Sequence, residues 1–245
     1  MDRLLYIAMT GARETSLAQA KAANNLANAN TTAFKADLAQ MRAMPIFNQG
    51  LPSRAFVMTE RPATDHSFGS LQTTGNDLDI AIKGDGFLAV QDANGQEAYT
   101  RGGELRVNAN GLLETSGGHL VLGNGGPIAI PPNEKLDIGG DGTISIKPQG
   151  APANAVLVID RIKLVNPDVR ETVKGEDGLF RRIDGAIALA DPNVSVVPGA
   201  LESSNVNAVA ELVDMISLAR QFEMNVKMMR VADENDSSLE QLMQL

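Results

Sequence analysis

The most constraining feature of this sequence is a heptad repeat near its C-terminal end. Within residues 200–245, apolar or small side chains recur at alternating steps of four and three residues. The positions are Ala208, Leu212, Met215, Ala219, Phe222, Val226 and Met229. This spacing predicts a long helix whose apolar stripe packs against another helix as a coiled coil. Asn205 and Asn207 lie just before the repeat, and either is a suitable N-cap.

The first 35 residues provide a candidate partner for that helix. They are rich in alanine and contain no proline. Helical spacing relates Leu5, Ala8, Ala12, Ala22, Leu26 and Ala29. Thr15 and Gln19 interrupt this thin stripe, but its small side chains allow a second helix to approach closely. The net charge is +2 for residues 1–35 and −5 for residues 200–245, which favours pairing of the two segments. Because such a face buries little, we expect the pair to be frayed in the free chain and completed by further neighbours.

Two further zones lie between the helical ends. Residues 36–68 contain Pro45, Pro52 and Pro62, and this pattern predicts an irregular, extended connector. Residues 69–199 consist of short β-type runs separated by glycine and asparagine turns. The clearest runs are LDIAI (78–82), FLAV (87–90), LRVN (105–108), HLVL (119–122), PIAI (127–130), TISI (143–146), AVLVI (155–159) and AIALA (186–190). No helical runs alternate with these strands, so the pattern favours antiparallel pairing.

Together these patterns predict a mixed fold with four zones. An N-terminal helix (1–35) and a C-terminal helix (200–245) pair as a coiled coil. An extended connector (36–68) leads to a mainly antiparallel β domain (69–199). The order of the strands does not follow from the sequence.

Composition argues against several classes of function. The net charge of −9, the absence of tryptophan and an aromatic content of 4% disfavour nucleic acid binding and an aromatic sugar platform. The chain has no cysteine, which excludes disulfides, thiolate nucleophiles and cysteine-based zinc sites. No apolar run approaches the ~20 residues that span a bilayer. The opening residues also lack the apolar core and cleavage site of a secretory signal.

Few residues are suited to catalysis. His66 and His119 are the only histidines, and they lie in different zones without the spacing of a metal site or a catalytic triad. Asp77 and Asp79 form the one tempting carboxylate pair, but they alternate with apolar residues as solvent-facing positions of a strand. We therefore predict no catalytic residue, no cofactor and no metal. A secreted β-rich enzyme acting on polysaccharide is an alternative.

Residues 22–35 read AANNLANANTTAFK, and here the chain resembles the flagellar rod and hook protein family. An ANNLAN-type segment and an NTxGFK-type ending are matched by Asn24, Asn25, Leu26, Ala27, Asn28, Asn30, Thr31, Phe34 and Lys35. Segments 71–91, 99–113 and 197–229 resemble later parts of the family in the same order. One departure is Ala33, where the family usually has glycine. Alanine is strained at positive φ, which argues against a left-handed turn there.

The asparagines at positions 24, 25, 28 and 30 are open to two interpretations. Asparagine competes with helical hydrogen bonding, so four of them near a helix are unusual. They are either a polar face near a helix end or a source of hydrogen bonds between subunits that fix register.

The resemblance implies a structural subunit of the bacterial flagellar basal-body rod, not an enzyme. It implies that the terminal helices form an inner coiled-coil layer, that the β domain faces outward, and that subunits stack helically to transmit torque from motor to hook. The coiled-coil or inter-subunit packing residues would be Leu5, Leu26, Leu212, Met215, Ala219, Phe222, Val226 and Met229.

The resemblance also implies partners and a location. The partners are further copies of the chain, neighbouring proximal and distal rod subunits, and the flagellar type III export apparatus. The rod lies in the periplasm, and its subunits are exported without a cleaved signal peptide. The stretches MDRLLYIAM (1–9), GGPIAIPP (125–132), DGTISI (141–146) and VADENDSS (231–238) favour a proximal-rod subunit. A distal-rod or hook subunit is the alternative, whereas a non-flagellar β adhesin would not account for paired terminal helices.

Overall fold

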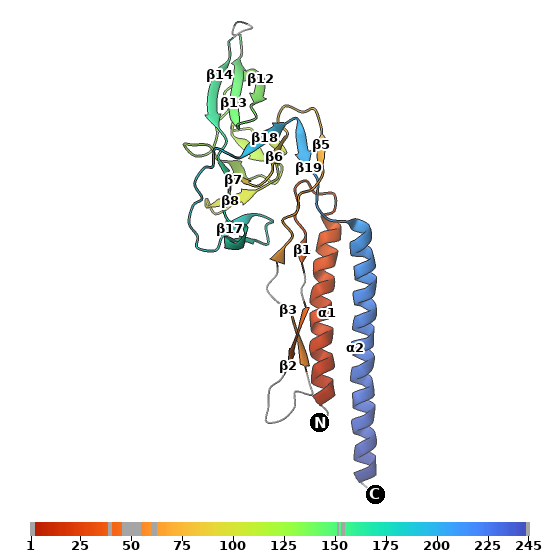
Figure 1. Ribbon diagram of the computed structural model, residues 1–245. Coiled ribbons are helices and arrows are strands. Elements are labelled where there is room, and N and C mark those ends of the chain that lie inside the picture. The colour runs from red at the N-terminus through yellow and green to blue at the C-terminus, as the bar shows by residue number, and fades with distance from the viewer. Residues whose placement is uncertain are drawn as a thin grey trace. The chain divides into compact units, whose positions relative to one another are not determined.

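The computed structural model describes residues 3–38, 41–45, 55–59, 63–150, 152 and 155–243 (Figure 1). The chain forms two units, each assembled from segments that are distant in sequence. The helical unit comprises residues 1–29, 36–65 and 206–245. The β unit comprises residues 30–35 and 66–205.

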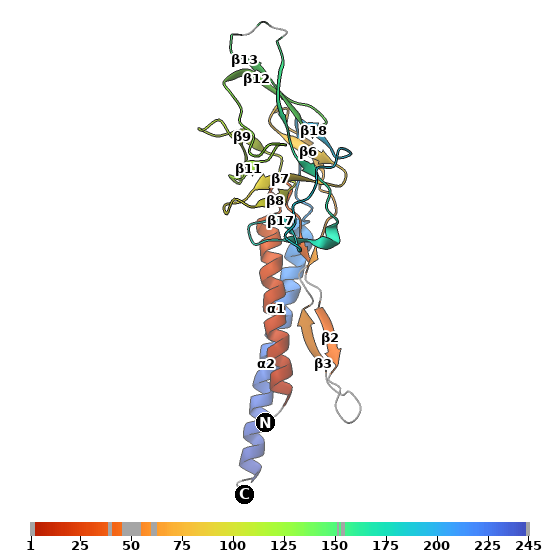
Figure 2. The same cartoon turned by 90° about the vertical axis from the view of Figure 1, so that its left-hand side faces the viewer.

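Two long helices dominate the helical unit. Helix α1 (Arg3–Ala27) has 25 residues and helix α2 (Ala208–Met243) has 36. They lie side by side and run antiparallel, so that the last turns of α2 extend past the start of α1 (Figure 1 and Figure 2). Asn207 caps α2, because its side-chain oxygen accepts from the N–H groups of Val209 and Ala210 at 3.1 and 3.2 Å.

Both helices are shorter than the sequence predicts. Helix α1 ends at Ala27, where Asn28 bonds back to the carbonyl of Asn24 through both its backbone N–H and its side chain. The predicted C-terminal helix loses its first residues to strand β19 (Ala200–Glu202), which pairs with β5 (Leu71–Thr73). Strand pairing and the cap at Asn207 therefore override the helical pattern at this end.

The segment predicted to be an irregular connector contains four strands. They are β1 (Asp37–Leu38), β2 (Met41–Pro45), β3 (Ala55–Thr59) and β4 (Ala63–Thr64). Strand β2 pairs with β3 and β1 with β4, both antiparallel, and β1 and β3 contact α1. Proline does not prevent this, because Pro45 is the last residue of β2. Pro52 and Pro62 lie outside the described residues.

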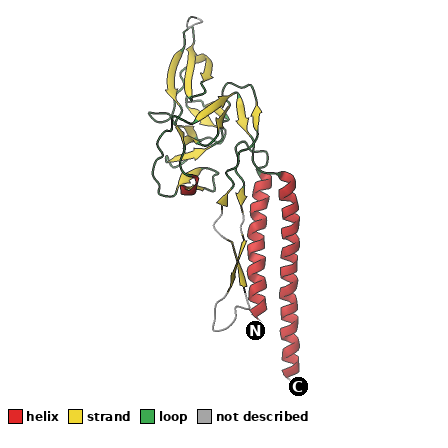
Figure 3. Ribbon diagram, viewed as in Figure 1, coloured by secondary structure: helices red, strands yellow, loops and turns green. Residues whose placement is uncertain are grey.

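The β unit is built around an eight-stranded sheet. Its order is β16-β17-β8-β7-β11-β10-β9, and β15 also pairs with β7. The strands are β7 (Phe87–Gln91), β8 (Glu97–Thr100), β9 (Leu105–Val107), β10 (Leu113–Thr115), β11 (Leu120–Val121), β15 (Leu164–Val165), β16 (Thr172–Lys174) and β17 (Phe180–Arg182). A short 3₁₀ helix, η1 (Val169–Glu171), precedes β16. Every strand pairing among the described residues is antiparallel, as predicted (Figure 3).

Smaller sheets complete the β unit. A three-stranded sheet holds β12 (Asn133–Ile138), β13 (Thr143–Pro148) and β14 (Leu157–Arg161) in that order. Strand β6 (Ile80–Lys83) pairs with β18 (Ser195–Pro198). Strand β5 likewise pairs with β19. These two pairings hold the first strands of the β unit against its last strands. Aliphatic side chains from most of these strands form one buried cluster that includes Leu88, Leu113 and Ile144.

Two predicted strands are wrong. PIAI (127–130) makes only single bridges, from Pro127 to Leu122 and from Ala129 to Leu112. Its leading proline has no N–H to donate to a ladder. AIALA (186–190) makes one bridge at its last residue, and the N–H of Ala188 donates instead to the hydroxyl of Tyr99 at 2.8 Å.

Candidate assembly surface

Apart from Glu14, the buried positions of α1 are occupied by small or short polar residues. The positions are Ala8, Ala12, Thr15, Ala18, Ala22 and Asn25. On α2, the least exposed residues recur with the same heptad spacing, at Glu211, Met215, Leu218, Asn225, Val226, Met229 and Ala232. Short side chains on one helix let longer ones on the other lie across its backbone. The seam between α1 and α2 is therefore narrow and close.

A polar layer crosses this seam near its middle. The side-chain amide of Asn225 lies 3.5 Å from the hydroxyl oxygen of Thr15, and the two residues are 9% and 1% exposed. The Thr15 hydroxyl donates to the carbonyl of Gly11 at 2.7 Å. A Cβ atom at Gly11 would lie only 3.2 Å from the amide oxygen of Asn225. Glycine at this position therefore makes the space that the Asn225 amide occupies.

A second polar layer lies at the other end of the seam. The Asn25 amide donates to the carboxylate of Glu211 at 2.9 Å and to the carbonyl of Asp37 at 3.0 Å. Its oxygen accepts from the backbone N–H of Asp37 at 2.9 Å. Asn25 thus ties α1 both to α2 and to β1. All three bonds lie within the chain, and they support a role for Asn25 in the register of α1 against α2. They do not test a hydrogen bond between subunits.

A large apolar surface remains uncovered on the opposite side of α2. It consists of Val209, Leu212, Val213, Ile216, Met224, Met228 and Val231, which we call the outer stripe. At about 100° per residue, the outer stripe lies across the helix from the residues that face α1. Val209 is 71% exposed and Val213 60%. Helix α1 also exposes Leu4, Leu5, Tyr6, Met9 and Leu17. A helix that is apolar on two opposite sides requires partners on both.

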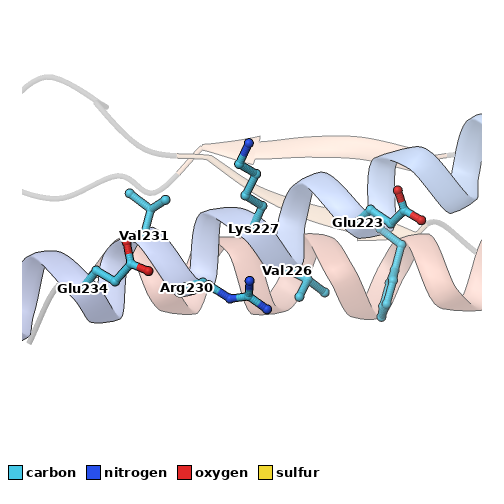
Figure 4. Close-up of a pocket in the computed structure, with 7 residues that line it drawn as sticks. Glu223, Val226, Lys227, Arg230, Val231 and Glu234 are labelled. Carbon is cyan, nitrogen blue, oxygen red and sulfur yellow. The ribbon is translucent and has the colours of Figure 1, made fainter.

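A groove follows the middle of α2. It has a volume of about 540 Å³ and combines three apolar residues with two acidic and two basic ones (Figure 4). The lining residues are Phe222, Glu223, Val226, Lys227, Arg230, Val231 and Glu234. Figure 4 shows Val226 and Lys227 pointing to opposite sides of the helix. The groove therefore offers apolar contact with charges of both signs at its margins.

The end of the N-terminal motif is part of the β unit, where it forms a buried ion cluster. The Lys35 ammonium bonds to one carboxylate oxygen of Glu202 at 2.7 Å, and the Arg101 guanidinium to the other at 2.7 Å. Arg101 also donates to three backbone carbonyls, those of Ile82, Gly84 and Gly86. The three charged side chains are at most 4% exposed. The motif lysine thus anchors its segment to β19.

The charges around Glu202 keep its carboxyl ionised. Burial, the largest influence, would raise the pKa of this group. The hydrogen bond from Lys35, the charge of Arg101 and the N–H of Gly69 outweigh burial, so the pKa lies below its ordinary value of 4.5.

Beside this cluster, Ala33 adopts the left-handed turn that the sequence argued against. Its φ is 57°, and it is the one described residue other than glycine with a positive φ. The Ala33 N–H donates to the carbonyl of Glu202 at 2.8 Å. The hydrogen bond and the neighbouring ion pairs hold the backbone in a conformation that alanine alone disfavours.

The predicted packing residues fall into two groups. Leu26, Met215, Ala219, Val226 and Met229 are half-buried in the helical unit. Leu5, Leu212 and Phe222 are exposed, at 39%, 48% and 38%. In the motif, Asn25 and Lys35 are buried, Phe34 is half-buried, and Asn24, Asn30 and Thr31 are exposed. Whether the exposed residues pack against other subunits stays a prediction.

Sequence reasoning missed the seam residues Thr15 and Asn225. It treated Thr15 as an interruption, because a polar residue breaks an apolar stripe. Their spacing could have identified them as seam residues. Thr15 lies one heptad from both Ala8 and Ala22, and Asn225 follows Leu218 by seven residues. A polar residue that keeps the heptad phase of a seam is a candidate for a buried layer.

Two of the residues considered for chemistry, Asp79 and His66, have structural roles. Asp79, predicted to face solvent, is buried and accepts from the side chains of Thr74 and Asn76 at 2.6 and 3.1 Å. It lies in the turn that leads into β6, and its backbone forms a bridge with Glu104. The ring of His66 contacts Phe180, with 5.6 Å between centroids. Among the described residues no cluster has the ligands of a metal site, and no described helix is long and apolar enough to cross a bilayer.

Three protein-family profiles match the chain at its two ends and its middle. The family described as "Flagella basal body rod protein" matches residues 5–35. The "Flagellar hook protein FlgE/F/G D1 domain" matches residues 81–146. The "Flagellar basal body rod FlgEFG protein C-terminal" family matches residues 197–242. The first and last matches cover the segments that contain α1 and α2.

Full-length relatives agree with these matches. The chain is 43% identical to the flagellar basal-body rod protein FlgF of Escherichia coli (strain K12) and 41% identical to FlgF of Salmonella typhimurium. Both alignments cover 100% of each chain. The flagellar basal-body rod protein FlgG of Agrobacterium fabrum is 34% identical, over 95% of this chain and 96% of its own length.

Proposed function

Because the chain belongs to the flagellar basal-body rod protein family, we propose that its two helices hold it in the rod as one structural subunit among many. The protein is a structural component of the flagellar basal body and not an enzyme. Its function is mechanical, so what matters is the surface through which one subunit contacts the next.

The outer stripe of α2 is the observation that carries the proposal. It presents Val209, Val213 and Ile216 to solvent on a helix whose other side already packs against α1. Burial of a large aliphatic side chain contributes about 1.5–3 kcal/mol. Several such side chains per subunit supply enough free energy to hold a stack of subunits together. The α1–α2 pair would then be one layer of a multi-helix coiled coil.

The contact should be head-to-tail and open. The outer stripe of one subunit would pack against the exposed apolar side chains of α1, such as Met9 and Leu17, on the next. A contact between two different surfaces generates an open helical filament when the rotation from one subunit to the next does not close into a ring, and we propose that open arrangement here. The net charges of the two terminal segments, +2 and −5, favour this pairing of unlike helices. The helices would line the inner layer of the rod, and torque would pass through them from the motor towards the hook.

Further parts of the proposal rest on the family resemblance. Neighbouring rod proteins would contact the two ends of the stack, and the type III export apparatus would deliver the chain to the periplasm without cleavage of a signal peptide. The high identity to two proteins named FlgF supports a proximal-rod position. The relative named FlgG keeps a distal-rod position as the alternative.

Deletion and complementation in the source bacterium test this function. We expect deletion of the gene to leave basal bodies with membrane rings and no completed rod in electron micrographs, and cells that do not swim. The unchanged gene should restore both. Complementation by Ile216→Asp, which puts a charge on the outer stripe, should fail although the protein is produced.

The matched control is Gln221→Asp, which puts the same charge on an exposed polar position of α2. It should restore swimming. Completed rods in the deletion strain would contradict the proposed function, whereas normal rods with Ile216→Asp would contradict only the role of the outer stripe.

A further inference from the structure

We propose that the two polar layers of the seam set the register of α1 against α2, and thereby the shape of the surface offered to neighbouring subunits. The inference rests on the proposed function for its consequence in the rod. The register itself is a property of the single chain. One layer consists of Gly11, Thr15 and Asn225, and the other of Asn25 and Glu211.

The spacing of the layers is the same on both helices. Gly11 and Asn25 are 14 residues apart on α1, and Glu211 and Asn225 are 14 residues apart on α2. Fourteen residues are two heptads, so both layers lie on the same face of each helix. In an antiparallel pair, only one register brings Asn225 to Gly11 and Glu211 to Asn25 at the same time.

The apolar part of the seam does not specify this register. The buried apolar residues on α1 are the four alanines at positions 8, 12, 18 and 22. If α2 slid by one heptad, its Met215 and Leu218 would still meet small side chains or a helix end. Packing against a row of alanines changes little on such a slip, so the apolar seam by itself distinguishes these registers only weakly.

The polar layers make every slipped register unfavourable. A slip of seven residues would place Asn225 opposite Ala18 in one direction or Leu4 in the other. Neither offers a hydrogen bond, and neither leaves the space that Gly11 provides beside the Asn225 amide. Glu211 would also lose Asn25. A buried amide without a partner shifts the equilibrium by roughly tenfold or more.

The register determines what a neighbouring subunit contacts. The outer stripe lies on α2, and exposed residues such as Met9 and Leu17 lie on α1. A slip of one heptad moves the two sets past each other by about 10 Å, at 1.5 Å per residue. Subunits in different registers would present different surfaces, and a regular stack requires one.

The absence of cysteine from the chain permits a direct test by disulfide formation. Counted from the two layers, Ala22 lies opposite Met215 in the native register. After a slip of one heptad it would lie opposite Phe222 or Ala208, depending on direction. Three double-cysteine chains therefore report the register, with Ala22→Cys combined with Met215→Cys, Phe222→Cys or Ala208→Cys. Each is oxidised in purified basal bodies and as the free chain, and disulfide-linked peptides are quantified by mass spectrometry.

With both layers intact, we expect the disulfide only in the chain that reports the native register. The double variant Asn225→Leu and Glu211→Leu removes the α2 side of both layers. It should raise the yield of the disulfides that report the two slipped registers at least tenfold. Each single variant should give a yield between those of the unchanged chain and the double variant. Asn25 keeps its bonds to Asp37 in these variants, so α1 is not otherwise disturbed. The matched control is Met229→Leu, an apolar exchange in the same seam, which should give the native disulfide alone.

Native disulfides alone in the double variant would overturn the proposal. If circular dichroism shows that the double variant has lost its helices, the single variant Asn225→Leu replaces it in the test. Native disulfides alone in that variant would likewise overturn the proposal. A chain that shows one register in solution but is absent from basal bodies would contradict the proposed function and leave the register role established.

Discussion

The β unit and the helical unit bury their side chains in opposite ways. In the β unit, large aliphatic residues such as Leu88, Leu113 and Ile144 are 0% exposed and belong to one cluster. In the helical unit, the buried residues of α1 are mainly alanines, and large residues such as Ile216 on α2 remain exposed. Because burial of a large aliphatic side chain stabilises far more than burial of alanine, the β unit has a core of its own. We expect the helical unit to be completed by contacts that the single chain does not contain.

The largest effect should come from the buried ion cluster of the β unit. Glu202→Gln removes the charge that Lys35 and Arg101 share and leaves both cations buried. We expect it to lower the free energy of unfolding by about 3–5 kcal/mol. The measurement is urea denaturation, monitored by the circular dichroism of the β unit. The control is Glu114→Gln, whose partner Arg106 is 61% exposed. That change should cost much less than the change at Glu202.

The same carboxyl predicts how the β unit responds to acid. Because the pKa of Glu202 lies below its ordinary value of 4.5 in the folded chain, ionisation of this group favours folding. Its stabilisation is complete above the ordinary pKa and is lost as the pH falls through the lowered pKa. Urea midpoints measured between pH 7 and pH 3 should therefore fall, and they should fall less in Glu202→Gln. An equal fall in both proteins would mean that Glu202 does not contribute.

A matched pair of leucines compares the two units directly. Leu88→Ala opens a cavity in the β core and should cost about 2–5 kcal/mol of unfolding free energy. Leu212→Ala changes a half-exposed residue of the outer stripe, and it should cost less than about 1 kcal/mol in the free chain. In complementation the order should reverse, with Leu212→Ala reducing the number of completed rods more than its stability explains. Equal stability losses would erase the distinction between the units.

A change at Ala33 should have a smaller effect, and it should stabilise the β unit where the preceding changes destabilise it. Because its φ of 57° is left-handed, Ala33→Gly should raise the free energy of unfolding by about 1 kcal/mol. Ala186→Gly serves as the control, since Ala186 is exposed and does not have a positive φ. There the added chain entropy should lower stability slightly. Both changes lie in the β unit, and thermal unfolding measures both.

Local patterns predicted most of the secondary structure. The heptad repeat identified α2, Asn207 was one of two named caps, and runs such as FLAV and TISI became strands β7 and β13. These signals depend on side chains within one helical turn or one strand, so they can be read directly. The patterns failed where a distant segment decided the outcome. Residues 200–202 form a strand because β5 lies beside them, and the connector is stranded because its two halves pair.

The site was less predictable for the same reason. Lys35 belonged to the motif, but its partner Glu202 is 167 residues away, and no local signal joins them. Asn25 belongs to the motif, but the sequence leaves its role open between two interpretations. Its bonds to Asp37 and Glu211 became visible only when the two ends of the chain were brought together. The sequence also does not show that Leu212 and Phe222 are exposed in the single chain, because a heptad repeat does not say which of two neighbouring stripes faces α1.

Limited proteolysis of the free chain and of purified basal bodies shows whether the helical unit depends on neighbouring subunits for its stability. We expect a protease to cut α1 and α2 quickly in the free chain and to leave a resistant fragment containing residues 66–205. In basal bodies the same helices should resist, because neighbouring subunits cover the outer stripe. If the helices of the free chain resist as long as the β unit, the helical unit does not depend on its neighbours for stability.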